Sequence, residues 1–445
     1  MLNREATVTR CTTIDSLPAV PPPSTQADCP AKWIAGSLMV AVLIAGGRWV
    51  SHVPIGPVYI SDVLMCGAAL YAFLAALTRK EKTLTYGPGV LIALVILWAT
   101  VRMLTPDGAL RVAARDAAPF VYCSAAYLST RACQRASVKA RKRTVRLLHC
   151  ALLIHAGWLA AALLTKDFAS MMPLLDGETF KLRPDFDSAM LGVLIGLSII
   201  RIREGKVWAN ASVAGAALFL LLFMQTRAGL LSCCACVAAA LMLRSRKGSR
   251  ITVRTILLVA AAVLVMFGLL PSSPAGERLI ATTGGVATSQ EARSAQGTTR
   301  ARLIAWQRVL DYTLDDPART VIGVGFGPDF LRLSDGDLPL GRGIGVRSPH
   351  NYLLGCFARL GLVGLMSITA LLSVLLAVAL STLWAGRPDE LTSISVLLVI
   401  SILIVSMLGV VLESPFGALP FFWASGILLG MHRSRRAQRG DGLGS

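Results

Sequence analysis

Long apolar stretches without charges recur along this chain and decide what it can fold into. Apolar residues make up 54% of its 445 positions and charged residues 16%, which is too apolar a balance for a soluble domain of this size. Twelve stretches approach the ~20 residues with which a helix crosses a hydrocarbon core. They are 33–48, 58–77, 88–104, 113–129, 147–164, 187–203, 208–224, 228–243, 255–270, 360–384, 391–411 and 416–431. We therefore predict an all-α integral membrane protein with about twelve transmembrane helices.

Two places in this series leave the helix count open. The stretch 113–129 carries Arg115 and Asp116 at its start, and charged side chains are costly inside a bilayer. The stretches on either side of residues 225–227 are divided by those three residues alone.

Basic residues are distributed unevenly around the apolar stretches. The net charge is +19, and every even-numbered stretch is followed by basic residues, whereas the short odd-numbered links are nearly free of them. This is the positive-inside pattern, which places both termini in the cytoplasm. The basic excess is thus mostly topological, so we expect contact with the lipid bilayer and no binding of nucleic acid.

The same features divide the chain into five parts. These are a disordered cytosolic tail (1–32), transmembrane helices one to nine (33–270), an extracytoplasmic loop subdomain (271–349), transmembrane helices ten to twelve (350–431) and a basic cytosolic tail (432–445). The insertion between spans nine and ten is far longer than the usual connection of about 4–6 residues. We expect it to carry a functional site on the outer face of the plasma membrane.

The ten cysteines do not predict a disulfide framework or a metal site. Most lie within or beside apolar stretches, and the long insertion has none. Cys233, Cys234 and Cys236 lack the CxxC spacing of zinc sites and have no ligand histidine nearby. We interpret them as small residues at a helix–helix contact, and we predict neither a metal nor another cofactor.

An amphipathic helix is predicted in the second half of the insertion. Residues 272–297 are rich in Ser, Gly, Ala and Thr and are expected to form a loop. From Thr299 onwards, Leu303, Trp306, Leu310 and Leu314 recur at helical spacing. The sequence Asp-Asp-Pro at 315–317 should end this helix.

Three glycines follow this helix, at Gly323, Gly325 and Gly327. Their spacing resembles half of a dinucleotide-binding fingerprint, but the strand and helix of a βαβ unit are missing. We interpret them as a tight turn that brings the backbone close to a neighbour.

His350 is the candidate proton acceptor. Ser348 and Pro349 precede it and read as the N-cap and first residue of a helix. A helix start disfavours the charged imidazolium, so His350 should be neutral at pH 7 and able to accept a proton. The alternative is a histidine whose ring only caps neighbouring backbone.

Two arginines are candidate anion-binding residues. Arg227 lies between two apolar stretches at the predicted outer boundary, where a charge is costly unless it is used. Arg302 lies on the predicted helix of the insertion. The arginine fork matches phosphate oxygens in a bidentate manner. Snorkelling to the interface is the alternative for Arg227.

Other charged residues on the predicted outer side are weaker candidates. Arg347 and Arg183 are further basic side chains for substrate binding. Asp185 and Asp187 lie in an outer link and are interpreted as solvated rather than sugar-binding or cation-binding. Glu413 is interpreted as a helix-end charge.

These residues together resemble the O-antigen ligase and polymerase family of membrane glycosyltransferases. The motifs that carry the resemblance are Thr226-Arg227-Ala228-Gly229, Arg302 to Trp306, Gly323 to Gly327, His350-Asn351 and Gly361 to Gly364. Their order around one large external loop also matches. The motifs span about 187–411, and each is short and degenerate.

The resemblance implies a GT-C-like fold and a glycosyl transfer that needs neither a metal nor a nucleotide sugar. The donor would be a glycan on an undecaprenyl-pyrophosphate carrier, and the acceptor a sugar hydroxyl on a lipid-anchored or carrier-linked glycan. By position, His350 corresponds to the family's essential histidine, and Arg227 and Arg302 to its two arginines.

Three functions remain open from the sequence. An O-antigen ligase is favoured over a polymerase of the same family, from which it differs in the acceptor. A secondary transporter would also suit twelve spans, but transporters keep polar or broken helices near the midplane. Here the candidate residues gather at the predicted outer edge.

Overall fold

The described part of the chain is almost wholly helical. The computed structural model describes residues 30–47, 54–55, 58–78, 87–104, 110–164, 182–202, 207–224, 226–244, 290–340, 347–385 and 388–440. The first half contains α1 (Pro30–Gly46), β1 (Pro54–Ile55), β2 (Val58–Tyr59), α3 (Ile60–Thr78), α4 (Pro88–Leu104), α5 (Leu110–Val121), α6 (Ser124–Arg135), α7 (Val138–Leu164), α8 (Pro184–Arg201), α9 (Val207–Met224) and α10 (Arg227–Arg244). The second half contains α13 (Gln290–Leu314), α14 (Pro317–Ile322), α15 (Phe330–Leu333), η4 (Leu338–Leu340), α16 (Tyr352–Ala385), α17 (Glu390–Met407), η5 (Val411–Glu413) and α18 (Pro415–Gly440). The two short strands pair antiparallel.

Several of these helices are suited to a bilayer. Among the described residues, α7, α9, α10, α16 and α17 are long and apolar enough to cross a membrane, and α1, α3 and α4 contain shorter apolar helices. The predicted helical fold is therefore confirmed for the described residues, and five of their helices are candidates for spanning a membrane. The predicted number of twelve stays a prediction, and the ninth predicted span, 255–270, lies outside the described residues.

The structure gives different answers for the two places where the sequence left the helix count open. The predicted single span 113–129 is wrong, because a turn at 122–123 separates α5 from α6. Pro119 lies inside α5, and a proline removes a backbone donor from a helix. In contrast, α9 and α10 are separate helices, and α8 packs against both of them.

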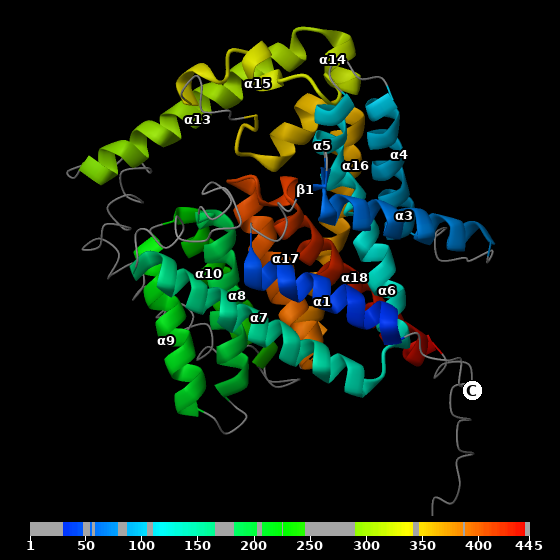
Figure 1. The fold of residues 1–445 in the computed structure, drawn as a ribbon, viewed down its shortest axis with the longest axis vertical. Helices are drawn as coiled ribbons and strands as arrows, with labels where there is room; N and C mark the ends of the chain where they lie inside the picture. The colour runs from blue at the N-terminus through cyan, green and yellow to red at the C-terminus, as the bar shows by residue number, and fades with distance from the viewer. Residues whose placement is uncertain are drawn as a thin grey trace, which may run out of the picture.

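The centre of the bundle is formed by α8, α17 and α18 (Figure 1). All residues of α8 from Phe186 to Ser198 are buried. Small residues let its neighbours approach closely: a Cβ on Gly192 would lie 3.2 Å from the Cα of Cys233 on α10. Ser232 and Ser401 share a hydrogen bond of 2.6 Å between α10 and α17. The predicted role of the cysteine cluster in a helix–helix contact is thus confirmed.

The helix of the insertion differs from its prediction in two ways. It begins at Gln290, so the part of the predicted loop from 290 to 297 is helical. Its fully buried side chains are Ala305, Val309 and Thr313, whereas Leu303 and Leu314 are exposed. The leucine spacing marked an apolar face, but the smaller residues pack against the rest of the chain.

The glycine turn after α14 packs against a break in α16. Gly361 lies within α16 with a φ of 63°, in the left-handed region, and Gly323 has a φ of 74°. A Cβ on Gly323 would lie 2.4 Å from the carbonyl oxygen of Arg359, so only glycine fits there. The tight-turn interpretation is therefore confirmed.

Three carbonyl groups of α16 just before the break accept hydrogen bonds from other elements. The backbone N–H groups of Val324 and Gly325 donate to Ala358 and Arg359, both at 2.9 Å. The indole Nε1 of Trp98 on α4 donates to Leu360 at 2.9 Å. Irregular backbone of this kind is tolerated in a membrane protein where neighbouring protein satisfies it.

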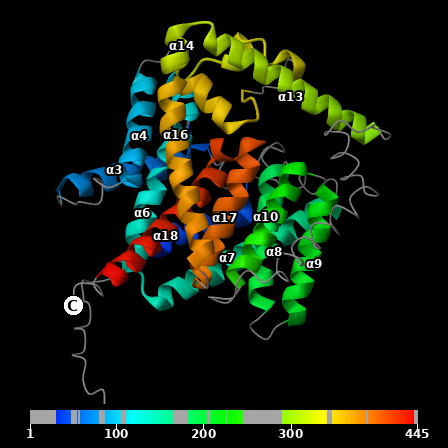
Figure 2. The ribbon, with the colours of Figure 1, turned by 180° about the vertical axis from the view of Figure 1, so that it is seen from behind.

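Polar contacts join the ends of the helices at two opposite faces of the bundle. We call the end of the bundle that carries α13, α14 and α15 the outer face; it lies at the top of both views (Figures 1 and 2). Here Arg227 at the start of α10 donates to Thr299, Arg302 donates to Leu408 beyond α17, and Arg102 near the end of α4 donates to Gly323.

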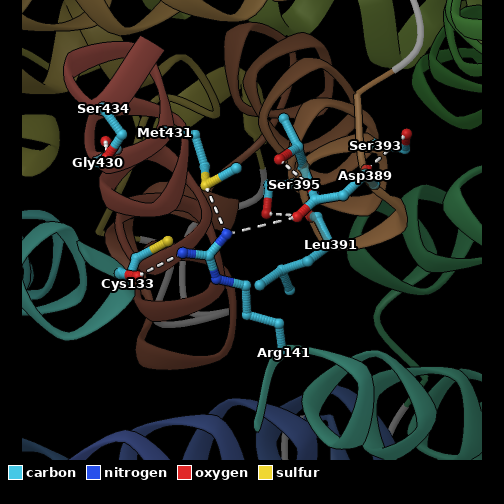
Figure 3. A network of polar contacts seen from close by, with 10 residues as sticks. Cys133, Arg141, Asp389, Leu391, Ser393, Ser395, Gly430, Met431 and Ser434 are labelled. Atoms are coloured by element: carbon cyan, nitrogen blue, oxygen red, sulfur yellow. Dashed lines mark hydrogen bonds and ion pairs between the residues drawn. The ribbon is translucent and has the colours of Figure 1, made fainter. Parts of the chain in front are cut away.

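The opposite end, the inner face, is held by Arg141 near the start of α7. Its guanidinium donates to the carbonyl of Cys133 at 3.2 Å and to the sulfur of Met431 at 3.3 Å, and it lies 3.8 Å from Asp389 (Figure 3). Asp389 in turn caps α17 by accepting from the N–H of Thr392. Arg141 belongs to the basic cluster that predicts the cytoplasmic side, so it serves packing as well as orientation.

The basic-residue asymmetry predicts that the outer face is extracytoplasmic. In a background depleted of accessible cysteines, Leu333→Cys should react with a membrane-impermeant maleimide in intact cells, because Leu333 is 54% exposed at the end of α15. Lys139→Cys, exposed at the inner face, should react only after permeabilisation. The parent background controls for residual thiols. The reverse labelling pattern would invert the orientation.

Candidate functional site

His350 lies in a short segment before α16, not in the first turn of a helix as predicted. The helix α16 begins at Tyr352, and the side chain of Asn351 accepts from the N–H of Leu354 at 3.1 Å. The backbone of His350 has a φ of 55°, a conformation that is uncommon outside glycine and asparagine. Such strain persists where neighbouring contacts enforce it.

Two elements hold this segment in place. The indole Nε1 of Trp306 on α13 donates to the carbonyl of Pro349 at 2.5 Å. The hydroxyl of Ser348 donates to Oε1 of Glu413 on η5 at 2.8 Å. The residues just before His350 are thus fixed from two sides.

His350 is neutral at pH 7, as expected, but for a different reason. Burial lowers its pKa, and the positive charges of Arg302 and Arg183 act in the same direction, so that the pKa is about 4. No helix start is involved. Its Nδ1 atom is buried and has no hydrogen-bond partner among the described residues. A buried polar atom without a partner is rare in native proteins, so Nδ1 is suited to meet a ligand or water.

Arg302 and Arg183 approach this histidine from two different elements. Arg302 lies on α13, and its Nη1 donates to the carbonyl of Leu408 at 3.1 Å. Arg183 is the N-cap of α8, where its backbone N–H donates to Asp187 at 2.7 Å. The positive charges of both guanidinium groups also interact electrostatically with the carboxyl group of Asp185, which lies in the first turn of α8. The structure thus brings two predicted arginines and the predicted histidine together.

Arg227 joins the same cluster through α13. Its Nη1 donates to the hydroxyl of Thr299 at 2.7 Å, and Thr299 precedes Arg302 by three residues, so both lie on one side of the helix. A Cβ on Gly229 would lie 2.3 Å from the hydroxyl oxygen of Ser188 on α8. Close packing at Gly229 therefore places the start of α10 beside the start of α8.

Arg347 does not join the cluster, although it is only three residues from His350. Its Nη2 lies 3.0 Å from the carboxylate of Asp116 on α5 and donates to the carbonyl of Gly327 at 2.9 Å. The same carboxylate accepts from Arg359 on α16 at 2.7 Å. Because Asp116 is only 7% exposed, these contacts anchor the segment rather than present a free charge.

Glu413 is the residue that sequence reasoning most clearly missed. Its interpretation as a helix-end charge is wrong, because the side chain lies beneath the His350 segment and packs against Gly355, where an added Cβ would lie 3.1 Å from Oε1. Burial raises its pKa to about 7, and the hydrogen bond from Ser348 opposes the rise. The short link around it carries no local signal of this burial.

Acidic residues of the outer link are also packed rather than solvated. Asp187 is 5% exposed, and its Oδ1 lies 3.4 Å from Nε2 of the buried His155 on α7. Oδ2 of Asp185 faces Gly409, where a Cβ would lie 2.5 Å away. Within the described ranges, no three His, Cys, Asp or Glu side chains gather in a way that would hold a metal ion.

Comparison with known proteins identifies the region that carries this cluster. A family model described as O-antigen ligase matches residues 212–369. The matched region includes Arg227, Arg302 and His350, and it ends just beyond the break in α16 at Gly361. No curated protein matches the chain.

The buried carboxyl of Glu413 predicts a pH dependence of stability. Its pKa is about 7 in the folded chain against an ordinary value of 4.5. Between these values the folded chain keeps a proton that the unfolded chain has lost, so the free energy of unfolding falls as pH rises through this window. Glu413→Gln cannot ionise and should lack this contribution. Thermal unfolding of both purified proteins across the window measures it, and parallel pH profiles would contradict the assignment.

Proposed function

We propose that this chain, which carries an O-antigen ligase domain, is a membrane glycosyltransferase that moves a glycan from an undecaprenyl-pyrophosphate carrier to an acceptor sugar hydroxyl. The reaction would take place on the outer face of the plasma membrane, without a metal or a nucleotide sugar. The observation that carries the proposal is the neutral, partly buried His350 next to the charges of Arg302 and Arg183. Arg227 completes the cluster through Thr299.

The arginines suit a pyrophosphate leaving group. When the bond between the anomeric carbon and the carrier oxygen breaks, the electron pair stays on the pyrophosphate and its negative charge grows. Preorganised cations in a site that excludes water stabilise such charge, and arginine forks match phosphate oxygens. Arg227, Arg302 and Arg183 come from α10, α13 and the N-cap of α8, so they can surround the group from several sides.

His350 suits the acceptor side of the reaction. The acceptor oxygen forms the new bond to the anomeric carbon, and its proton passes to the imidazole. A pKa of about 4 makes the resting histidine a weak base. Binding of the anionic donor would neutralise the nearby arginine charges and raise this pKa, so the base would strengthen when the donor is present.

Two alternatives make different demands on the protein. A polysaccharide polymerase of the same family would use the same cluster with a carrier-linked acceptor. A secondary transporter would need a polar pathway through the bundle, whereas the described candidate residues gather at the starts of α8 and α10 and on α13. Transfer by the purified chain from carrier-linked glycan, with lipid-anchored and carrier-linked acceptors tested in parallel, distinguishes the three. Absence of transfer to both acceptors would refute the proposal.

Arg227→Lys and Arg302→Lys test the pyrophosphate contact. Lysine keeps the charge but loses the fork, so we expect transfer to fall by about tenfold or more in each variant. Arg347→Lys is the matched control, since this arginine is held by Asp116; it should lower thermal stability more than donor affinity. Wild-type turnover in both test variants would rule out the contact.

His350→Ala should nearly abolish transfer, because removal of a general base typically costs about 10²–10⁴ in rate. His350→Gln separates this role from a structural one. Glutamine keeps a hydrogen-bonding side chain but cannot accept a proton at neutral pH. Rates are compared in protein that remains folded and binds donor. If His350→Gln keeps most of the activity, the histidine is not the base.

A further inference from the structure

A cavity lies on the outer face, away from the residues around His350. Its volume is about 880 Å³, within the range of about 300–1,000 Å³ that is usual for ligand pockets. It is formed by the end of α4, the C-terminal end of α13, α14, the glycine turn and α15. None of the residues of the His350 cluster lines it.

Arginine side chains from separate elements line this cavity. Arg102 comes from α4 and donates to the carbonyl of Gly323 at 3.1 Å. Gly325 leaves room for it, because a Cβ there would lie 2.9 Å from its Nη2 atom. Arg332 on α15 is exposed and forms no ion pair within the described residues.

The other polar side chains that line the cavity also determine which ligands would fit it. Arg319 contributes little free charge, since its guanidinium contacts Asp315 and Asp316 and lies 4.0 Å from the ring centroid of Tyr312. Asp329 accepts from the backbone N–H of Arg332 at 3.3 Å, which leaves carboxylate lone pairs for other donors. Arginine donors beside a carboxylate acceptor suit a ligand with both an acidic group and hydroxyl groups.

The position of the cavity relates it to the proposed reaction. Tyr312 lies ten positions after Arg302 on the same helix, about 15 Å along its axis. The glycine turn that forms one wall is bonded to the broken region of α16, which follows His350. A glycan chain whose reacting end lies at His350 could therefore place a more distant sugar in this cavity.

We propose that this cavity is a subsite for an acidic sugar, bearing a carboxylate or a phosphate, within the acceptor glycan. Arg102 and Arg332 bind the acidic group, and Asp329 accepts hydrogen bonds from the sugar hydroxyls. The subsite selects acceptors and takes no part in the transfer itself. The assignment to an acceptor rests on the proposed function, whereas binding of the acidic sugar does not.

Binding is tested first, with the full chain in detergent and glucose 6-phosphate as the probe against glucose. We expect glucose 6-phosphate to bind more tightly, and Arg332→Glu to weaken its binding by about tenfold or more. Arg308→Glu is the matched control, since Arg308 is a basic residue of α13 that does not line the cavity. Arg302→Lys should retain binding, which separates this cavity from the pyrophosphate contact. Equal binding of both sugars, or wild-type affinity in Arg332→Glu, overturns the proposal.

Transfer kinetics then test the role of the subsite. Arg332→Glu should raise KM for an acceptor that carries an acidic sugar by about tenfold and leave kcat and the KM of its neutral counterpart unchanged. Equal changes for the two acceptors overturn acceptor selection. If the probe binds as expected but no acceptor is used, the proposed function fails while the sugar subsite stands. If nanodiscs of phosphatidylglycerol displace the probe and glycans do not, the cavity binds a lipid headgroup and the proposal is wrong.

Discussion

The backbone contact between Gly323 and the break in α16 is the constraint on which the outer face depends. It requires left-handed backbone at both Gly323 and Gly361 and leaves no space for a Cβ at either. In return, three carbonyl groups of α16 just before the break accept hydrogen bonds from the glycine turn and from Trp98. The turn joins the end of α14 to α16, and α14 follows α13 directly. One contact thus sets where α13, with Thr299, Arg302 and Trp306, lies over the bundle.

Buried charge is the second organising element. The carboxylate of Asp116 accepts hydrogen bonds from Arg347 and Arg359, and the carboxyl group of Glu413 accepts one from Ser348. Both carboxyl groups lie beside the segment that ends at His350, and the histidine joins this network through its backbone N–H, which donates to the hydroxyl of Ser348 at 3.4 Å. Removing one partner of a buried ion pair is costly, because the other charge is left uncompensated. The residues that hold the segment are thus different from those proposed to bind the substrate.

Local signals in the sequence predicted some of these features and not others. The glycine spacing predicted a tight turn because the left-handed backbone is a property of those residues themselves. Arg227 stood out because charge is costly among apolar neighbours, and Arg302 because it lies on the predicted helix of the insertion. Periodicity showed that α13 is amphipathic, but not that Ala305 and Val309 would be buried in place of Leu303. Glu413 gave no signal, because its burial depends on Ser348, which lies 65 positions away in the chain.

The pairing of Asp116 with Arg359 also bears on how the chain is made. The two residues are 243 positions apart, and ribosomes add about 5–20 residues each second. The carboxylate of α5 therefore waits roughly ten seconds to a minute for its partner, while the intervening helices enter the bilayer. Until Arg347 and Arg359 have been made, the carboxylate of Asp116 lacks both of these partners, and an unpaired charge is costly inside a bilayer. The outer face, whose glycine turn bonds to the broken region of α16, can therefore be completed only after α16 has been made.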